Sequence, residues 1–287
     1  MSIAYLNGEY LPLAEARISP LDRGFLFGDG IYEVIPYYNG QSVGLMPHIE
    51  RMINGLAAIE IKSTLTADDW KTLLDDLIAR NSEVGENLGV YVHVSRGADV
   101  KRLHAYPDNV EPTIFAFAFK IKDPEPADRT QAHQYSMITT EDLRWQRCHI
   151  KSTALLGNVI HYQEGHAAGA DEAMLFNAKG ELTEGSSTNV FIVKDGVVAT
   201  PVQDNQILPG ITRRIVLDSL KADGSIKVEE RIITMDEVRA ADEVWITSSS
   251  KEIAPVTKLD GKPVGNGEVG EVWEAAFKIY TAAKFGV

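Results

Sequence analysis

One lysine and one glutamate stand out by their sequence surroundings. Lys151 lies in the segment Arg147-Cys-His-Ile-Lys-Ser152, directly before residues whose apolar positions recur at helical spacing. Glu184 lies in Thr183-Glu-Gly-Ser-Ser-Thr-Asn-Val-Phe191, directly before glycine and a run of hydroxyl residues. An amine at a helix N-terminus is favoured in its neutral, nucleophilic form, and a buried carboxylate requires a cationic partner. An enzyme that uses pyridoxal 5'-phosphate needs both, an amine for imine formation and a carboxylate for the pyridine nitrogen. The pair therefore predicts amino-group transfer.

Such a cofactor also needs donors for its phosphate. The segment Leu208-Pro-Gly-Ile-Thr-Arg213 predicts a helix that begins after glycine and leaves the N–H groups of Ile211 and Thr212 free. Thr247-Ser-Ser-Ser250 ends a predicted strand and offers hydroxyl groups, and Arg51 could add a bidentate charge. A helix cap, a polar turn and a surface arginine are the ordinary alternatives for these three features.

Two other patterns carry less weight. The segment Gly265-Asn-Gly-Glu-Val-Gly270 matches the dinucleotide-binding pattern but lacks the βα unit that must follow, so it predicts a loop. His161, Glu164 and His166 do not have the spacing of a zinc-binding helix, so no metal site is predicted.

Composition limits the classes of partner. The net charge of −13 argues against a nucleic-acid partner or an anionic membrane surface, because either would demand a basic face. Cys148 is the only cysteine, which is typical of a reducing cytoplasm. No apolar run has the length of a membrane span, and the first residues lack the pattern of a secretory signal. We expect a cytoplasmic protein.

The elements that must position these residues fall into two groups. A polar segment at 122–133, with prolines at 124 and 126, predicts a linker between an N-terminal domain at 1–121 and a C-terminal domain at 134–287. Strands and helices alternate without a strict βαβ rhythm, which indicates an α+β fold. The expected N-terminal elements are a hairpin over 5–13, strands over 31–38, 89–95 and 113–119, and helices over 48–60 and from 66, where a capping box begins. The expected C-terminal elements are helices over 153–168, 210–221 and 271–283, and strands over 172–177, 189–193 and 243–247.

Five segments together resemble the class IV, fold-type IV aminotransferases. They are Asp22 to Glu33, Arg147 to Ser152, Thr183 to Phe191, Pro209 to Arg213 and Thr247 to Ser250. The resemblance runs from about Tyr5 to Tyr280. It implies a small N-terminal α/β domain, a larger C-terminal pseudo-barrel domain, and a homodimer with pyridoxal 5'-phosphate in the interdomain cleft.

The resemblance also assigns roles to particular residues. Lys151 is expected to form the imine with the cofactor and to move the proton at the substrate Cα, and Glu184 is expected to bind the pyridine nitrogen. Tyr32 and Arg144 fall on further active-site positions, which we expect to bind substrate. The expected phosphate ligands are Arg51, Ile211, Thr212, Ser248 and Ser249.

One segment indicates which member of the family this is. Lys101-Arg-Leu-His-Ala-Tyr106 resembles the segment by which D-amino-acid transaminases bind the substrate α-carboxylate from the partner subunit, so Arg102 and His104 are expected to do so here, with Tyr32. Pro36 stands where a branched-chain enzyme is expected to carry arginine. We therefore expect a D-amino-acid aminotransferase that converts D-alanine and 2-oxoglutarate to pyruvate and D-glutamate. Branched-chain or (R)-amine transamination, or an aminodeoxychorismate-type lyase, are the alternatives.

Overall fold

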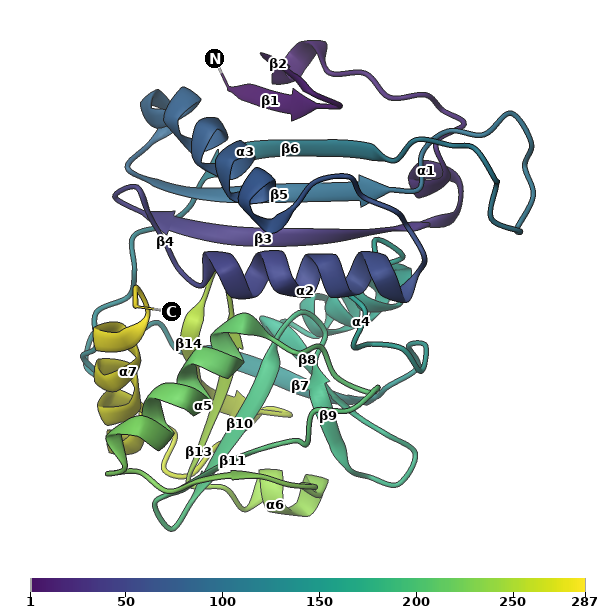
Figure 1. Cartoon of the computed structure of the whole chain (residues 1–287). Helices are drawn as coiled ribbons and strands as arrows, with labels where there is room; N and C mark the ends of the chain where they lie inside the picture. The colour runs from purple at the N-terminus through teal and green to yellow at the C-terminus, as the bar shows by residue number, and fades with distance from the viewer. Residues whose placement is uncertain (1, 287) are drawn as a thin grey trace. The chain divides into compact units, whose positions relative to one another are not determined.

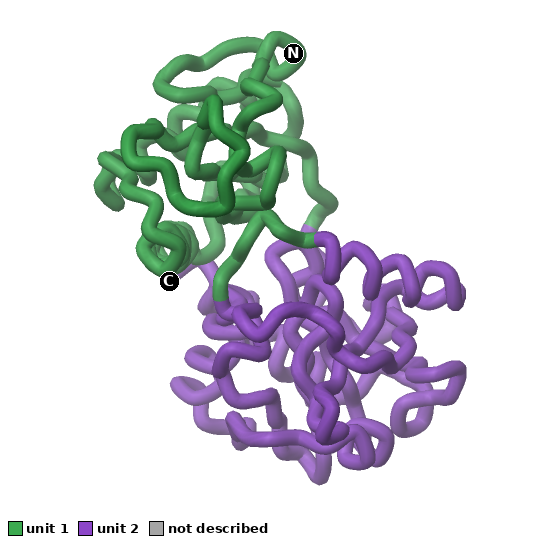
Figure 2. The backbone as a smooth tube through the Cα atoms, turned by 90° about the vertical axis from the view of Figure 1, so that its right-hand side faces the viewer, with its two compact units in different colours: residues 1–123, 150–155, 287 green, residues 124–149, 156–286 purple. Residues whose placement is uncertain are grey.

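The structure is a computed structural model that describes residues 2–286. These residues form two compact units, coloured separately in Figure 2. The first unit comprises residues 2–123 and 150–155, and the second comprises residues 124–149 and 156–286. The segment that contains Lys151 thus packs with the N-terminal unit although it lies beyond the polar linker in sequence. The predicted domain limits of 1–121 and 134–287 stay a prediction.

The first unit is built on a six-stranded antiparallel sheet in the order β2-β1-β6-β5-β3-β4 (Figure 1). Its elements are β1 (Ile3–Leu6), β2 (Glu9–Pro12), a 3-10 turn (Leu13–Glu15), α1 (Arg23–Phe27), β3 (Gly30–Tyr38), β4 (Gln41–Ser42), α2 (Leu45–Ala58), α3 (Ala67–Arg80), a second 3-10 turn (Ser82–Val84), β5 (Asn87–Ser95) and β6 (Thr113–Lys120).

Alternation along β5 decides which face of this sheet is covered. Val90, Val92 and Val94 are fully buried and belong to the core that α2 and α3 complete. Tyr91 and His93, between them, lie on the opposite face. The predicted capping box at the start of α3 is present, since Thr66 and Asp69 bond each other's backbone N–H.

The second unit contains a nine-stranded mixed sheet. Along the main path its order is β12-β11-β10-β13-β14-β7-β8-β9, and β15 pairs with β14. Its elements are β7 (Tyr135–Glu141), α4 (Leu156–Ala167), β8 (Glu172–Phe176), β9 (Leu182–Gly185), β10 (Asn189–Lys194), β11 (Val197–Thr200), α5 (Ile211–Asp223), β12 (Val228–Glu230), α6 (Met235–Arg239), β13 (Glu243–Ser248), β14 (Glu252–Leu259), β15 (Lys262–Pro263) and α7 (Glu271–Ala283).

The sheet of the second unit curls on itself. β9 and β10 are far apart in the strand order, yet one tight turn joins them, with Gly185 N–H donating to Thr188 O at 2.7 Å. A twisted sheet that curls in this way forms a half-barrel. Met174, Val190 and Ile246 come from three different strands and are fully buried in its core.

One sequence prediction needs correction. The helix predicted at 153–168 begins only at Leu156, so Lys151 is not at its N-terminus and the helix-dipole argument for its amine does not apply. The apolar side chains of this helix lie largely in solvent: Leu156, Val159 and Ile160 are 72%, 58% and 50% exposed.

The Gly265–Gly270 segment is a turn directly before α7, as the sequence predicts. Among the residues the structure describes, no helix is long and apolar enough to cross a lipid bilayer.

Candidate active site

Lys151 is held against the first residues of β3. Its carbonyl accepts from Tyr32 N–H at 3.0 Å, and Thr153 Oγ1 donates to the carbonyls of Gly28 and Gly30. The Lys151 Nζ lies 4.1 Å from the centroid of the Tyr32 ring. The aromatic contact and the bonded backbone favour one placement of the amine over the many that are open to a surface lysine. The structure thus brings together two of the predicted residues, Lys151 and Tyr32.

Tyr32 belongs to an aromatic group on the face of the first sheet opposite α2 and α3. Its ring stacks on Tyr91 at 5.8 Å between centroids, and Tyr91 Oη lies 3.1 Å from His93 Nδ1. Burial, with a smaller contribution from Tyr32, raises the pKa of Tyr91 to about 12. Tyr91 was not predicted as a site residue. The alternation of β5 could have placed it on this face, but not beside Tyr32, since strand pairing decides that.

Glu33, His48 and Arg51 form a buried cluster in the first unit. Glu33 accepts from Arg51 Nε at 2.8 Å, from Arg51 Nη2 at 2.7 Å, and lies 2.7 Å from His48 Nδ1. Burial acts to raise the pKa of Glu33, but Arg51 and His48 outweigh it and hold that pKa well below its usual range. Sequence reasoning selected Arg51 and missed the two partners. Its role as a phosphate ligand stays a prediction.

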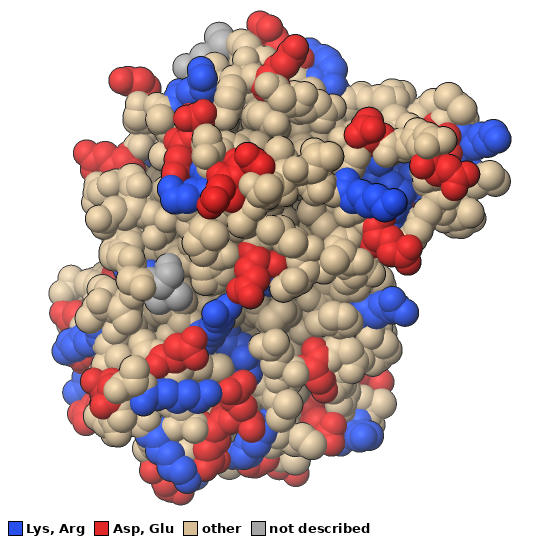
Figure 3. Space-filling view, viewed as in Figure 1, with Lys and Arg blue, Asp and Glu red and all other residues tan. Residues whose placement is uncertain are grey.

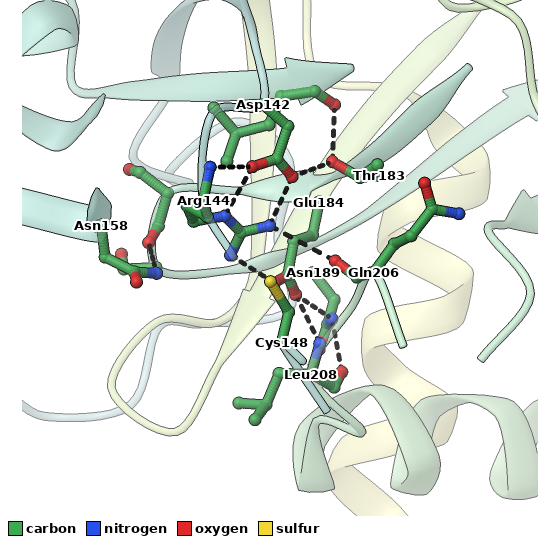
Figure 4. A network of polar contacts seen from close by, with 12 residues as sticks. Asp142, Arg144, Cys148, Asn158, Thr183, Glu184, Asn189, Gln206 and Leu208 are labelled. Carbon is green, nitrogen blue, oxygen red and sulfur yellow. Dashed lines mark hydrogen bonds and ion pairs between the residues drawn. The ribbon is translucent and has the colours of Figure 1, made fainter. Parts of the chain in front are cut away.

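Glu184 is the centre of a buried polar network in the second unit (Figure 4). Its Oε1 accepts from Arg144 Nη1 at 2.6 Å, and its Oε2 accepts from Asn189 Nδ2 at 3.0 Å and from Leu208 N–H at 2.9 Å. Asp142 takes the other nitrogens of Arg144, with contacts of 2.9 and 2.7 Å. In this structure Arg144 therefore orients Glu184. Its predicted contact with substrate stays a prediction.

The electrostatics of Glu184 fit a cationic ligand. Burial raises the pKa of Glu184 to about 7, against the opposing effect of Arg144. A carboxylate oxygen accepts two hydrogen bonds, and Oε1 has one donor among the described residues. A pyridinium N–H would supply both the second donor and the missing positive charge. The residues around Glu184 thus fit the expected cofactor.

The turn that follows Glu184 is fixed by a second buried carboxylate. Glu172 Oε1 lies 2.7 Å from Ser187 N–H and 2.9 Å from Thr188 Oγ1, and both groups donate to it. Glu172 is fully buried in β8. It thereby ties down the turn that joins β9, which carries Glu184, to β10, which begins at Asn189. The sequence did not indicate Glu172, because its partners Ser187 and Thr188 are 15 and 16 positions away.

The N-terminus of α5 offers unpaired donors, as a phosphate requires. No side chain of the described residues caps this helix, so the N–H groups of Ile211 and Thr212 have no capping partner. A Cβ on Gly210 would overlap Asn189 Oδ1, so a side chain here would displace the amide that binds Glu184 and Leu208 O. Thr247, paired in register with Asn189, has a buried Oγ1 without a partner among the described residues. These observations fit a phosphate group.

The predicted hydroxyl groups lie where β13 ends: Ser248 is its last residue and Ser249 follows it. Ser248 Oγ accepts from Lys251 N–H at 3.1 Å and lies 3.4 Å from Ser250 Oγ. Ser249 follows in the turn and is half-buried. Ser248 and Ser249 as phosphate ligands stay a prediction.

Arg102 and His104 lie in the exposed connection between β5 and β6. The Arg102 guanidinium carbon lies 5.1 Å from the Phe27 ring centroid, and the His104 ring lies 5.4 Å from it. The two predicted carboxylate-binding residues are therefore gathered on one aromatic ring.

A histidine of α4 has a structural explanation. His161 Nε2 accepts from Leu143 N–H at 3.2 Å, and its Nδ1 lies 3.0 Å from Glu164. No group of three or more potential metal-ligating side chains gathers anywhere in residues 2–286.

Comparison with known proteins identifies relatives along most of the chain. The family model described as amino-transferase class IV matches residues 30–259. A D-alanine aminotransferase of Staphylococcus epidermidis is 39% identical over 274 residues, which cover 95% of this chain and 94% of that protein. D-alanine aminotransferases of Bacillus licheniformis and Listeria innocua are also 39% identical, over 92% and 93% of this chain and 90% and 91% of theirs.

Solved structures share the fold. A branched-chain amino acid aminotransferase of T.th., complexed with N-(5'-phosphopyridoxyl)-L-glutamate, superposes with a TM-score of 0.88 at 26% identity, covering 99% of this chain and 94% of that one. The Escherichia coli branched-chain enzyme gives a TM-score of 0.89 at 23% identity, covering 99% and 95%. The predicted α+β architecture of fold type IV is confirmed.

Proposed function

This chain belongs to the class IV aminotransferase family, and from that premise we propose that it transfers the amino group of D-amino acids to 2-oxo acids. The expected reaction converts D-alanine and 2-oxoglutarate to pyruvate and D-glutamate. The observation that carries the proposal is 39% identity to D-alanine aminotransferases over 95% of the chain. Its substrates are thus an amino acid and a 2-oxo acid.

The cofactor is pyridoxal 5'-phosphate, as in other class IV aminotransferases. When bound, it supplies an aldehyde carbon that receives the amino group and a pyridine ring that withdraws electron density from the substrate Cα. The chain supplies the proton transfers, the charge that favours the ring nitrogen's proton, and the contacts that orient the reactants.

Lys151 is the proposed acid and base. Its amine takes the proton from the substrate Cα and returns a proton to the cofactor carbon that carried the aldehyde, so one group serves both steps. The backbone bonds between Lys151 and Tyr32 fix where the side chain starts, and the Tyr32 ring beside Nζ limits where it points.

Glu184 is the proposed partner of the pyridine nitrogen. Its carboxylate holds the proton on that nitrogen, which makes the ring a better acceptor of electron density. Arg144 and Leu208 N–H hold the two carboxylate oxygens in place, so the charge needs no reorganisation during the reaction.

The phosphate is assigned to donors of several kinds. The N-terminus of α5, with Ile211 and Thr212, supplies backbone N–H groups and the positive end of a helix dipole. Hydroxyl groups come from Ser248 and Ser249, and Arg51 adds a guanidinium. Such anchoring would hold the cofactor in place through both half-reactions.

The substrate carboxylate is assigned to Arg102 and His104, with Tyr32. A guanidinium matches a carboxylate with two parallel hydrogen bonds, and this recognises amino acids and 2-oxo acids alike. Because a transaminase binds both kinds of substrate in turn, a site for their shared group serves both half-reactions.

A substrate comparison tests the proposed function. The purified holoenzyme is incubated with 2-oxoglutarate and either D-alanine or L-leucine, and formation of pyruvate or 4-methyl-2-oxopentanoate is measured. We expect turnover of D-alanine and at least about 100-fold lower kcat/KM with L-leucine, a discrimination of about 2.7 kcal/mol. Turnover of L-leucine without action on D-alanine would instead support a branched-chain enzyme, the class to which both superposed structures belong.

We also propose that the protein is a homodimer in the cytoplasm. The exposed apolar face of α4, formed by Leu156, Val159 and Ile160, is unusual for a surface that meets only water. In the first unit, a second set of exposed apolar side chains comprises Ile18, Leu21, Phe25, Val100, Leu103 and Tyr106.

The face of the molecule drawn in Figure 3 shows acidic and basic side chains interspersed, without the continuous basic surface that nucleic acid would require.

A charge on α4 should separate the protomers. The substitution Val159→Glu places a carboxylate in the proposed apolar contact, and its desolvation there would weaken dimerisation by about 100-fold or more. Sedimentation velocity at micromolar concentration is expected to give a dimer for the wild-type protein and a monomer for the variant. Val202→Glu, at another exposed valine of the second unit, is the matched control and should stay dimeric. A monomeric wild-type protein would contradict the proposal.

A further inference from the structure

A buried ion cluster underlies the connection between β5 and β6. Asp29 Oδ2 accepts from Arg23 Nε at 2.7 Å and from Arg96 Nε at 2.8 Å, and its Oδ1 accepts from Arg96 Nη2 at 3.0 Å. Arg23 and Arg96 are 3% and 6% exposed. One carboxylate thus holds together two arginines from separate segments: one begins α1 and the other follows β5.

Arg23 binds the connection, here called the 97–112 loop, at two places. Its backbone N–H donates to Gly97 O at 2.8 Å, where the loop begins. Its guanidinium donates to Leu103 O at 2.6 Å and to His104 O at 3.3 Å, in the middle of the loop. Two successive carbonyl groups of the loop, those of Leu103 and His104, are thereby bound to a buried side chain.

Arg96 fixes the far part of the same loop. Its guanidinium carbon lies 3.5 Å from the centroid of the Tyr106 ring, and its Nη2 donates to Ile59 O at 2.6 Å. The arginine is therefore anchored to the end of α2 on one side and to the loop on the other. Tyr106 is half exposed, and the stacking on Arg96 keeps one face of its ring against the protein.

Phe27 completes the arrangement. Its ring lies 4.8 Å from the Arg23 guanidinium carbon, in addition to its contacts with Arg102 and His104. The α1 helix on which it sits is fixed by Asp22, whose side chain accepts from Gly24 N–H and from the hydroxyls of Ser95 and Thr113. The loop therefore rests on a rigid support.

We propose that Asp29 is a positioning residue for substrate binding. By holding Arg23 and Arg96 together, it fixes the 97–112 loop in the conformation that presents Arg102 and His104 to the substrate carboxylate. That the loop presents Arg102 and His104 to the substrate rests on the proposed function. That Asp29 fixes the loop does not.

The charge of Asp29 is what makes it suited to this role. Burial alone would raise its pKa, but hydrogen bonds from Arg96 and Arg23 outweigh burial and lower it, so the side chain is ionised at neutral pH. The substitution Asp29→Asn keeps the shape and removes the charge. Two buried guanidinium groups are then left side by side without a counter-ion, and they repel each other.

Limited proteolysis tests the loop directly. Trypsin cleaves after lysine and arginine, and Lys101 and Arg102 lie exposed in the loop. Below the temperature of global unfolding, cleavage at these two sites, mapped by mass spectrometry, is expected to be about tenfold faster in the Asp29→Asn holoenzyme than in the wild-type holoenzyme. This measurement does not depend on activity.

Steady-state kinetics test the consequence. For Asp29→Asn we expect the KM values of D-alanine and 2-oxoglutarate to rise about tenfold or more while kcat changes by less than about threefold, as when binding common to ground and transition state is lost. Arg102→Met, which removes the guanidinium itself, gives the reference value for complete loss of that contact.

Asn81→Ala is the matched control in the same unit. Asn81 is buried and ties β1 to α3 through Ile3 and Leu77. Its loss should lower the melting temperature without accelerating loop cleavage or raising KM. If Asn81→Ala reproduced both effects of Asp29→Asn, general destabilisation would explain them and the proposal would be overturned.

The remaining outcomes separate the positioning role of Asp29 from the proposed function. Unchanged cleavage and KM in Asp29→Asn, with a raised KM in Arg102→Met, would overturn the positioning role and leave the proposed function intact. An unchanged KM in Arg102→Met would count against the proposed carboxylate contact. The rate of tryptic cleavage in Asp29→Asn would then test only whether Asp29 fixes the loop. If Asp29→Asn does not fold, Arg23→Lys serves, because a single ammonium nitrogen does not reproduce the fork with which Nε, Nη1 and Nη2 of Arg23 reach Asp29 and the two loop carbonyls.

Discussion

Replacement of Lys151 by alanine is expected to lower kcat on the order of 10⁴-fold or more. The amine is the group assigned both to the imine with the cofactor and to the proton transfers at the substrate Cα, so the substitution removes two functions at once. In the variant the backbone carbonyl at position 151 stays bonded to Tyr32 N–H, but the Tyr32 ring then faces an alanine methyl group instead of an amine.

Two measurements separate a lost reaction from a lost fold. Fluorescence titration should show that the Lys151→Ala protein still binds the cofactor phosphate, since the proposed phosphate donors are elsewhere in the chain. In the wild-type holoenzyme, borohydride reduction followed by peptide mapping should place the cofactor on Lys151. Lys62→Ala, at an exposed lysine of the same unit, is the control and should be fully active. A Lys151→Ala protein that kept more than about a tenth of wild-type activity would refute the assignment.

Replacement of Glu184 by glutamine is expected to lower kcat by about 100-fold or more. The amide has almost the same shape but cannot hold a proton on the pyridine nitrogen as an ionised carboxylate does, so the electrostatic stabilisation is lost. Glu181→Gln, three residues before Glu184 in the sequence, should retain activity. Near-wild-type activity in Glu184→Gln would mean that another group serves the pyridine nitrogen.

The same substitution has a distinct effect on the stability of the protein without cofactor. Burial raises the folded-state pKa of Glu184 to about 7, above its value of 4.5 in an unfolded chain. Between these two pH values the folded state holds a proton that the unfolded state has lost, so the free energy of unfolding falls as pH rises from about 4.5 through about 7. Glutamine does not titrate and lacks this decrease.

Urea unfolding of the two cofactor-free proteins measures this difference. Relative to the wild-type protein, Glu184→Gln should gain stability as pH rises from 5 to 8, because only the wild-type protein must ionise a buried carboxylate. The remaining partner of Arg144, Asp142, still compensates that arginine in the variant. A constant difference in unfolding free energy across this pH range would contradict the raised pKa.

Local sequence was sufficient for the elements that contain their own signals. The Asn7–Gly8 turn adopts the positive φ values that its residues favour, and it joins β1 and β2 as predicted. The capping box of α3 and the strand predicted at 89–95, which is β5, were also correct, because each depends on residues within a few positions of one another. Lys151 and Glu184 were selected from their neighbours in sequence in the same way.

Helical spacing identifies which side chains of α4 share a face, but not what covers that face. The apolar residues of α4 do lie at helical spacing, yet Leu156, Val159 and Ile160 are exposed. Periodicity states that these side chains share one side of the helix. It cannot state whether that side meets the protein's own core or another protomer.

The partners that orient the candidate site came only from the tertiary structure. Asp29 and Arg96 are separated by 67 positions, and Arg144 and Glu184 by 40, so no local pattern links either pair. The sequence by itself determined which residue types are available for the chemistry and which segments carry them. The pairing of strands and the turns between them determined which counter-ion each charged residue has. A buried charge is compensated by the groups that the fold brings within hydrogen-bonding distance.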